Sequence, residues 1–241
     1  MVGIRLDRAL SKLGLASRAD ARRLIEAGAV TLRGKTITNP AHLVAPDRAA
    51  IAVAGRTAPA VEWRTIAFHK PRGVVTTRRD PEGRKTVFDL LGEAGDSLVT
   101  VGRLDMASTG LLILTTDTQL AAWLTDRASA IIRRYIVTAR GAVSDEEARA
   151  LEAGIDGLRA KSVEVLKRSK RETHLIIELT EGRNREIRRL LEAVGHEVTR
   201  LLRVSFGGIE LGSLQPGRSR DIPREEIESA FPRYLPRTAY K

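Results

Sequence analysis

The sequence predicts an α+β protein built from two unequal parts, on three observations. The first 56 residues hold two short helical patterns and a hairpin signal. Thr57–Ala60 consists of small residues and a proline without periodicity, as in a linker. Beyond it, strand-like runs follow one another several at a time, which favours a mostly antiparallel sheet over strict strand–helix alternation. We therefore expect domains at 1–56 and 63–241, joined by a linker at 57–62.

The first part is predicted to hold two helices followed by a short sheet. Leucines at helical spacing predict a helix over 6–13, and Ser17–Asp20 has the form of a capping box that begins a second helix. Val30–Leu32 and Thr36–Thr38 flank a glycine-containing turn, which is a hairpin signal, and Ile51–Gly55 should return as a further strand. We expect a compact α/β unit.

The charge balance indicates a polyanionic partner. The 241 residues include 41 Lys and Arg against 30 Asp and Glu, giving a net charge of +11 at pH 7 and a pI near 10.6. Each phosphate contact releases counterions, so nucleic acid binds such a surface favourably. An anionic membrane is the competing partner, but no apolar run approaches the roughly 18–20 residues that span a bilayer. The N-terminus lacks the apolar core of a signal peptide, so we expect a cytoplasmic protein that binds nucleic acid and no membrane.

Metal and redox chemistry are not indicated by the sequence. The absence of cysteine excludes disulfides and cysteine-ligated zinc and fits a reducing compartment. The histidines are widely separated and show no metal-ligand spacing. Asp105, Asp117 and Asp126 do not form a recognisable ligand set, whereas metal-assisted phosphoryl chemistry usually needs clustered carboxylates. We therefore expect neither a metal nor a cofactor.

Basic residues recur at helical spacing in the first part. Two pairs, each four residues apart, would share a helix face. Like charges at this spacing repel each other, which a bound anion would offset, and a solvated charged face is the alternative. The candidate RNA-contact set is Arg8, Lys12, Arg18, Arg22, Arg23 and Lys35.

The same region resembles a known RNA-binding family. Leu6–Arg18 and Ile25–Lys35 are similar to the S4 RNA-binding domain, and the match covers nearly all of the first part. The resemblance implies that two helices and a hairpin lie against structured RNA.

Strands and helices are both expected in the second part. Apolar and β-branched runs predict strands, and longer amphipathic patterns predict helices. The expected strands are Thr65–Phe68, Leu111–Leu114, Tyr135–Thr138 and Leu175–Leu179, and the expected helices are Asp145–Ala153 and Asn184–Val194.

A glycine-bounded turn in the second part carries a candidate nucleophile. Gly102–Asp105 places an arginine and a carboxylate directly before the apolar run Ser108–Thr115. A turn held on a rigid strand can present Asp105 to a substrate. The alternative is that Asp105 only caps the turn.

Four segments of the second part occur in the order found in one enzyme family. They are Lys70–Gly73, Gly102–Asp105 with its extension to Thr115, Arg133–Val137, and Glu181–Leu190 continuing to Val198. Together they resemble the RsuA/RluB-like family of ribosomal RNA pseudouridine synthases across nearly all of this part. The resemblance implies a mostly antiparallel catalytic domain that isomerises a uridine in ribosomal RNA. One departure is Asp117–Thr118, where the family often has Asp-Gly.

The resemblance assigns three catalytic residues. Isomerisation breaks the bond between N1 and C1′, turns the base and rejoins it through C5. Asp105 is then the carboxylate that acts at C1′, and Arg188 is the cation that pairs with it and keeps it ionised. Tyr135 would pack against the target base and is a candidate for proton transfer. The alternative for Tyr135 is a core residue whose hydroxyl is satisfied elsewhere.

Five further residues are expected to hold the substrate. By resemblance, Ile187 forms the other wall of the base pocket, although a helical isoleucine is usually a core residue. Arg103 would hold the backbone of the flipped nucleotide, which must leave the base stack before it can react. Lys70 and Arg72 on a Pro-Gly turn, together with Arg185, would contact phosphates, and a solvated turn is the alternative.

The sequence also bears on the target. Asp80–Leu91 and Asn184–Arg189 are most similar to the large-subunit branch of the family, so 23S rRNA or a ribosomal assembly intermediate is the expected partner, and 16S rRNA is the alternative. A non-catalytic ribosome-assembly factor is an alternative from another class, but a pure binder has no use for a carboxylate among phosphate-binding cations. An RNA hydrolase is a further alternative, but such an enzyme would be expected to have several carboxylates close together at one site. We expect the protein to be a monomer.

Overall fold

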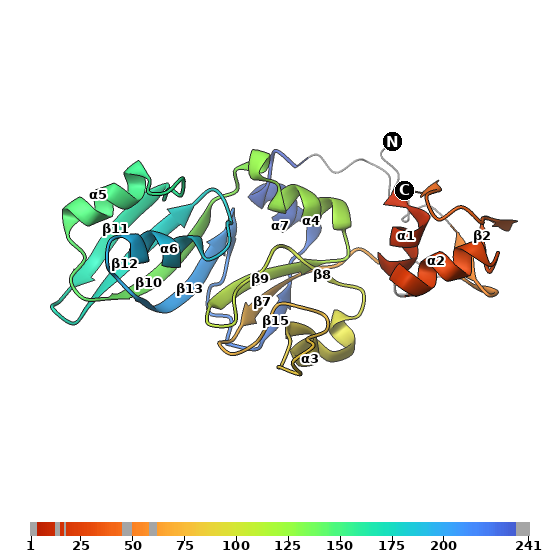
Figure 1. Cartoon of the computed structure of the whole chain (residues 1–241), viewed down its shortest axis with the longest axis horizontal. Helices are drawn as coiled ribbons and strands as arrows, with labels where there is room; N and C mark the ends of the chain where they lie inside the picture. The colour runs from red at the N-terminus through yellow and green to blue at the C-terminus, as the bar shows by residue number, and fades with distance from the viewer. Residues whose placement is uncertain (1–3, 13–14, 17, 45–49, 58–61, 235–241) are drawn as a thin grey trace. The chain divides into compact units, whose positions relative to one another are not determined.

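The computed structural model describes residues 4–12, 15–16, 18–44, 50–57 and 62–234. Its contacts divide the chain into two compact units (Figure 1). The first comprises Met1–Trp63 with Glu93–Ser97, and the second comprises Arg64–Gly92 with Leu98–Lys241. Each unit has its own buried apolar cluster. Within the described part of the chain, no helix is both long and apolar enough to cross a bilayer.

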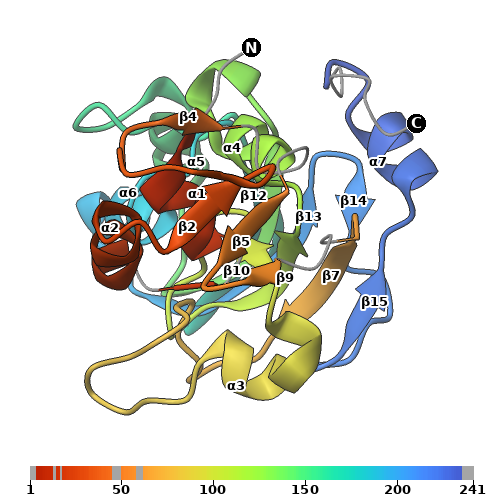
Figure 2. The same cartoon turned by 90° about the vertical axis from the view of Figure 1, so that its right-hand side faces the viewer.

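The first unit packs two helices against short strands (Figure 2). The elements are β1 (Ile4–Arg5), α1 (Leu6–Lys12), α2 (Arg18–Glu26), β2 (Val30–Leu32), β3 (Lys35–Thr36), β4 (Leu43–Val44), β5 (Ile51–Val53) and β6 (Arg56–Thr57). Leu10 and Ile25 from the helices meet Val30 and Ile51 from the strands in the core. The expected helices and hairpin are therefore present, whereas Ser17 of the expected capping box lies outside the described residues.

The second unit is built on one nine-stranded sheet. Its path runs β11 (Ser162–Arg168), β12 (Glu172–Leu179), β10 (Arg133–Arg140), β13 (Val198–Phe206), β9 (Thr109–Thr115), β7 (Thr65–Lys70) and β15 (Ser219–Asp221), with β14 (Ile209–Glu210) on β13 and β8 (Val99–Thr100) on β9. Among these strands only the β9–β13 pair is parallel, which confirms the mostly antiparallel class. The four expected strands became β7, β9, β10 and β12.

The parallel pair forms a seam between the two halves of the sheet. Here β9 and β13 approach so closely that a Cβ atom on Gly110 would lie 2.2 Å from the carbonyl oxygen of Arg203 and 2.6 Å from its nitrogen. Gly110 also has a φ of +109°, a conformation that residues with a side chain rarely adopt. Glycine is therefore required at this position for the seam to close.

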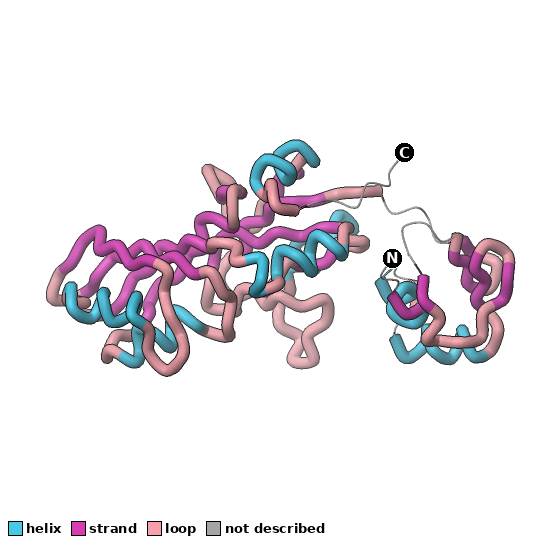
Figure 3. The backbone as a smooth tube through the Cα atoms, turned by 90° about the horizontal axis from the view of Figure 1, so that it is seen from above, coloured by secondary structure: helices cyan, strands magenta, loops and turns pink. Residues whose placement is uncertain are grey.

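Five α-helices flank this sheet among the described residues. They are α3 (Val87–Leu91), α4 (Thr118–Thr125), α5 (Asp145–Ala153), α6 (Glu186–Ala193) and α7 (Arg224–Ala230), with a short 3₁₀ turn η2 (Arg127–Ser129). A second 3₁₀ turn, η1 (Gly92–Gly95), falls mostly in the segment Glu93–Ser97 that groups with the first unit. Figure 3 shows α5 and α6 on the same side of the sheet half that contains β10 and β12. The sequence predicted α5 with its observed bounds, and α6 begins two residues later than expected because Arg185 adopts a left-handed φ of 52°.

Two helix starts are explained by side-chain caps. Asp117, at the departure from the family pattern, accepts hydrogen bonds from the backbone N–H groups of Gln119 and Leu120 and so caps α4. Ser144 and Glu147 form a capping box at the start of α5. The aspartate of the family pattern is therefore the cap, and Thr118, in place of the glycine, is the first residue of α4.

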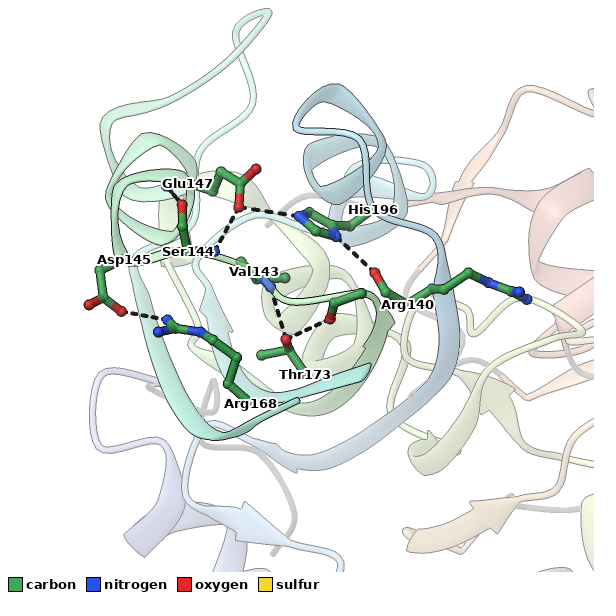
Figure 4. Close-up of polar contacts among 9 residues, drawn as sticks. Arg140, Val143, Ser144, Asp145, Glu147, Arg168, Thr173 and His196 are labelled. Carbon is green, nitrogen blue, oxygen red and sulfur yellow. Dashed lines mark hydrogen bonds and ion pairs between the residues drawn. The ribbon is translucent and has the colours of Figure 1, made fainter. Parts of the chain in front are cut away.

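A polar network ties α5 to the segment that follows α6 (Figure 4). The Nε2 atom of His196 lies 3.2 Å from the Glu147 carboxylate, and its Nδ1 atom lies 2.8 Å from the carbonyl oxygen of Arg140. Nearby, Thr173 accepts from the backbone N–H of Val143 and donates to Gly141. Since α6 brings Ile187 to the cavity described next, this network holds the far end of the helix in place.

Candidate active site

The second unit contains a cavity of about 290 Å³ that several of the expected site residues share. Asp105 reaches it from the turn before β9, Tyr135 from β10 and Ile187 from α6. These residues are separated by 30 to 82 positions in the sequence (135 − 105 and 187 − 105), so the sheet and α6 bring them together. Arg103 and Arg185 also line the cavity.

The turn that carries Asp105 is held by hydrogen bonds to its backbone carbonyls. The Thr76 hydroxyl donates to the carbonyl of Leu104 at 2.7 Å, and the Gly73 N–H donates to the carbonyl of Met106 at 2.8 Å. Because backbone groups on both sides of Asp105 are anchored, the carboxylate is presented from a fixed turn. Its two oxygens make no hydrogen bond within the described residues, which leaves them available to a substrate.

Lys70 supports the same turn from inside the protein. Its side chain is 0% exposed, and its Nζ atom donates to the carbonyl oxygens of Ser108 at 2.8 Å and Pro71 at 3.0 Å. Burial lowers the pKa of Lys70 to about 8, and the negative charge of Asp105 partly opposes that shift. Our expectation that Lys70 contacts a phosphate is therefore wrong: β7 is buried along its whole length, and Lys70 is its last residue.

The side chain of Arg188 also contacts the turn, at a backbone carbonyl. Its Nη1 atom donates to the carbonyl of Val198 at 2.8 Å, and its Nη2 atom makes a longer contact of 3.4 Å with the carbonyl of Ala107. Among the ion pairs of the described residues, none joins Arg188 to Asp105, so the expected direct pair is not formed. Burial and the nearby Arg185 lower the pKa of Arg188, whereas Asp105 raises it, so the two charges still act on each other.

Tyr135 and Ile187 are buried side chains that face the cavity. Tyr135 is 7% exposed, and its hydroxyl finds no hydrogen-bond partner in the described part of the chain. A core tyrosine would be expected to satisfy its hydroxyl within the protein, so this arrangement weighs against the purely structural alternative. Both side chains are placed to contact an aromatic base.

The remaining residues expected to contact RNA are exposed in both units, where their side chains are described. Arg103 and Arg185 are exposed at the cavity lining, in line with a role in holding a nucleotide backbone. Arg72 is exposed too but does not line the cavity. In the first unit Arg8, Arg22, Arg23 and Lys35 are exposed, and the side chains of Lys12 and Arg18 lie outside the described part.

Two of the exposed arginines of α2 have acidic partners. Arg22 lies 3.4 Å from Glu26, and Arg23 pairs with Asp20. These neighbours reduce the like-charge repulsion that the sequence predicted for this helix face. The helix remains basic at its surface, but no bound anion is needed to stabilise it.

Sequence reasoning missed several residues that line the cavity. They are Arg127, Arg133, Arg183, Asn184, Glu186, Arg203 and Phe206, together with smaller neighbours. With Arg103 and Arg185, the lining holds six arginines against two carboxylates, Asp105 and Glu186. Burial raises the pKa of Glu186, which disfavours the charged form of this carboxyl group. Side chains alternate between the two faces of a strand, so Arg133 and Tyr135 of β10 lie on the same face. This alternation is the sequence signal that could have identified Arg133 as a lining residue.

The arrangement fits a polyanionic substrate. In the described ranges, no group of three or more His, Cys, Asp or Glu residues could hold a metal ion. A single accessible carboxylate lies beside a tyrosine, inside a rim of cations. Such a site can hold a phosphate backbone while the carboxylate attacks or stabilises an electron-poor carbon.

Comparison with known proteins agrees with this geometry. Residues 64–193 match the family model of RNA pseudouridylate synthase, and residues 4–48 match that of the S4 domain. The chain is 38% identical to the Escherichia coli ribosomal large subunit pseudouridine synthase B, over 96% of this chain and 81% of that protein. It is 32% identical to an uncharacterized RNA pseudouridine synthase of Aquifex aeolicus, over 98% of this chain and 99% of the other.

A solved structure extends the similarity to the fold. A pseudouridylate synthase crystal structure superimposes with a TM-score of 0.64 at 25% identity, covering 94% of this chain and 99% of that one. On the combined evidence of sequence and fold, the chain belongs to the RNA pseudouridylate synthase family and carries an S4 domain at its N-terminal end.

Proposed function

We propose that the protein converts one uridine of large-subunit (23S) ribosomal RNA to pseudouridine. The observation that carries the proposal is the convergence of Asp105, Tyr135 and Ile187 on one arginine-rich cavity. The large-subunit assignment rests on relatives such as the E. coli protein, whose name specifies that subunit. The reaction needs no redox change, since the product is an isomer of the substrate.

In the proposed reaction, Asp105 acts at C1′ of the flipped nucleotide. The bond between N1 and C1′ breaks, the base turns, and a bond forms between C5 and C1′. C5 loses its proton and N1 gains one, so atoms and electrons balance. Tyr135 packs on the base throughout and is a candidate to receive the C5 proton. Arg103 and Arg185 at the cavity lining hold the nucleotide backbone.

Lys70 and Arg188 act on Asp105 without touching the substrate. Both donate to backbone carbonyls of the turn, and both carry charges that interact with the carboxylate. Lys70 and Arg188 thus place two positive charges near Asp105, the carboxylate that acts at C1′. In this proposal their charges take the place of the direct Asp105–Arg188 pair.

The first unit supplies RNA affinity. Its exposed basic residues, with Arg8 and Lys35 outside the local ion pairs, would contact phosphates of folded RNA. We place the domain boundaries at 1–56 and 63–241, and we propose a monomer that works in the cytoplasm on ribosomal RNA or an assembly intermediate.

Release of tritium from uridine labelled at C5 tests the proposal, because the C5–H bond is lost only when pseudouridine forms. Wild-type protein should release tritium from a large-subunit rRNA transcript and not from a small-subunit one. Asp105→Asn should release none while its RNA affinity stays within about tenfold, roughly 1.4 kcal/mol. Asp96→Asn, an exposed aspartate outside the cavity lining, is the matched control and should behave as wild type. Full activity of Asp105→Asn would rule out the mechanism.

A further inference from the structure

The floor of the cavity contains a pair of buried arginines that the proposed reaction does not use. On β13 and β10, Arg203 is paired with Tyr135, and Phe206 is paired with Arg133. Arg203 is 3% exposed and Arg133 is 6% exposed, yet both line the cavity together with Asp105. Cross-strand partners share a face of the sheet, so both arginines lie beside the tyrosine.

Arg203 is held in place but its hydrogen-bonding capacity is largely unused. Its Nε atom donates to the carbonyl of Leu111 at 2.7 Å, which fixes the direction of the guanidinium. Its Nη2 atom is shielded from solvent and has no acceptor within the described residues. A buried donor without an acceptor is costly, so its persistence in a cavity wall calls for an explanation.

Neither of the two arginines forms an ion pair with a carboxylate, although Asp105 and Glu186 line the same cavity. Nearby Arg134 and Arg183 each pair with a carboxylate, at 2.8 Å from Glu178 and 2.5 Å from Glu181. Over the described ranges, no carboxylate lies within ion-pair distance of Arg133 or Arg203. Burial lowers the pKa of Arg133, Tyr135 and Glu186 oppose that shift, and the neighbouring Arg203 adds to it, so the two cations repel each other.

Internal contacts satisfy Arg133 better than Arg203. Arg133 donates through Nη1 to the carbonyls of Ile131 and Thr180, and through Nη2 to that of Leu124. Both guanidinium groups also approach the ring of Phe206, at 4.8 Å for Arg133 and 5.3 Å for Arg203. A cation–π contact with phenylalanine is weaker than the cost of burying an unpaired ion, so Arg203 remains the group in need of a partner.

We propose that Arg203, reinforced by the positive charge of Arg133, is a substrate-binding residue that donates to an oxygen of the flipped nucleotide. The subsite lies next to Tyr135 and would take either a phosphate oxygen or a carbonyl oxygen of the uracil ring. A phosphate would satisfy both the charge and the free donors, and a carbonyl would satisfy the donors alone. This inference rests on the proposed function, because it assigns part of the same substrate to the cavity floor.

The test replaces Arg203 by methionine, which keeps much of the length of the side chain and removes the charge. Arg200→Met is the matched control, because Arg200 lies on the same strand, is exposed and does not line the cavity. Three quantities are measured for each protein: the midpoint of thermal unfolding without ligand, its shift on adding inorganic phosphate or uridine, and the single-turnover rate of tritium release.

The proposal gives a combination of results that a structural role would not. Arg203→Met should be at least as stable as wild type without ligand, because an unpaired buried charge is removed. It should lose the ligand-induced shift seen in wild type, and its single-turnover rate should fall at least 100-fold. A wild-type shift with phosphate alone identifies a phosphate oxygen, and a shift with uridine alone identifies a base carbonyl. Arg200→Met should retain both the shift and the rate.

Other outcomes would overturn the inference. These are an unshifted wild type with both ligands, an Arg203→Met protein that keeps the shift and rate, and an Arg203→Met protein destabilised in proportion to its loss of activity. The ligand shifts do not depend on catalysis. Absence of tritium release by wild type would therefore refute the proposed function while the shifts still decide the subsite.

Discussion

Lys70 should make the stability of the fold depend on alkaline pH. Its pKa falls from 10.5 to about 8 in the folded protein, because the side chain is fully buried. Between these two values the unfolded chain binds a proton that the folded chain does not, so stability rises with pH across this window. A shift of 2.5 units (10.5 − 8), at about 1.36 kcal/mol per unit, corresponds to about 3 kcal/mol of charge-burial cost at neutral pH.

The prediction is measured by urea unfolding of wild type and Lys70→Met from pH 7 to pH 9.5. The variant loses two hydrogen bonds to carbonyls, which adds an offset that changes little with pH. Over the range in which folded Lys70 loses its proton, wild type should gain about 2 kcal/mol relative to the variant. Lys170→Met removes an exposed lysine in the β11–β12 turn and should give a profile parallel to wild type. Parallel profiles for Lys70→Met and wild type would refute the assignment of a buried, charged Lys70.

Two further substitutions test the seam and the helix network. Gly110→Ala should lower the unfolding free energy by about 3 kcal/mol or more, because strain at positive φ adds to a clash with the backbone of Arg203. Gly83→Ala, with a φ of +69° and open space around it, should cost only about 1 kcal/mol in the same denaturant titration, and equal losses would contradict the close approach. A hydrogen bond from the Ser144 backbone, and a smaller contribution from His196, lower the pKa of Glu147 below its ordinary value of 4.5. The ionised Glu147 therefore stabilises the fold above pH 4.5, and this stabilisation is lost as the pH falls further and the carboxylate is protonated. Glu147→Ala should therefore cost roughly 1 kcal/mol at pH 7 and less at pH 4, while the exposed Glu146→Ala serves as the control; a Glu147→Ala deficit unchanged by pH would count against the carboxylate as its source.

Local sequence signals predicted the elements that depend on local chemistry. Ser144 and Glu147 form a capping box that fixes the start of α5, and the bounds of that helix were predicted correctly. The Gly102–Asp105 turn was predicted because glycine, the acidic side chain and the apolar run behind it are adjacent in the chain. Short helices such as α3, with five residues, were missed because so few positions show no clear period.

The properties that sequence reasoning missed arise from contacts between distant segments. Lys70 looked like a surface cation on a Pro-Gly turn, but it pairs with Gly110 of β9 and its buried side chain donates to the carbonyl of Ser108, which no local pattern shows. Arg203 faces Tyr135, across 68 positions of sequence (203 − 135), because the register of β10 against β13 shifts by one residue between Arg134 and Tyr135. A one-residue change of that register would turn Arg203 to the other face of the sheet.

The central claim is that Asp105 carries out uridine isomerisation at one position of ribosomal RNA. The most direct measurement maps pseudouridines in both rRNAs by carbodiimide labelling and primer extension, in a deletion strain that carries either wild type or Asp105→Asn. The account predicts one stop in the large-subunit RNA that disappears on deletion and returns only with wild type. A stop that Asp105→Asn restores equally well, or a map that deletion leaves unchanged, would contradict it.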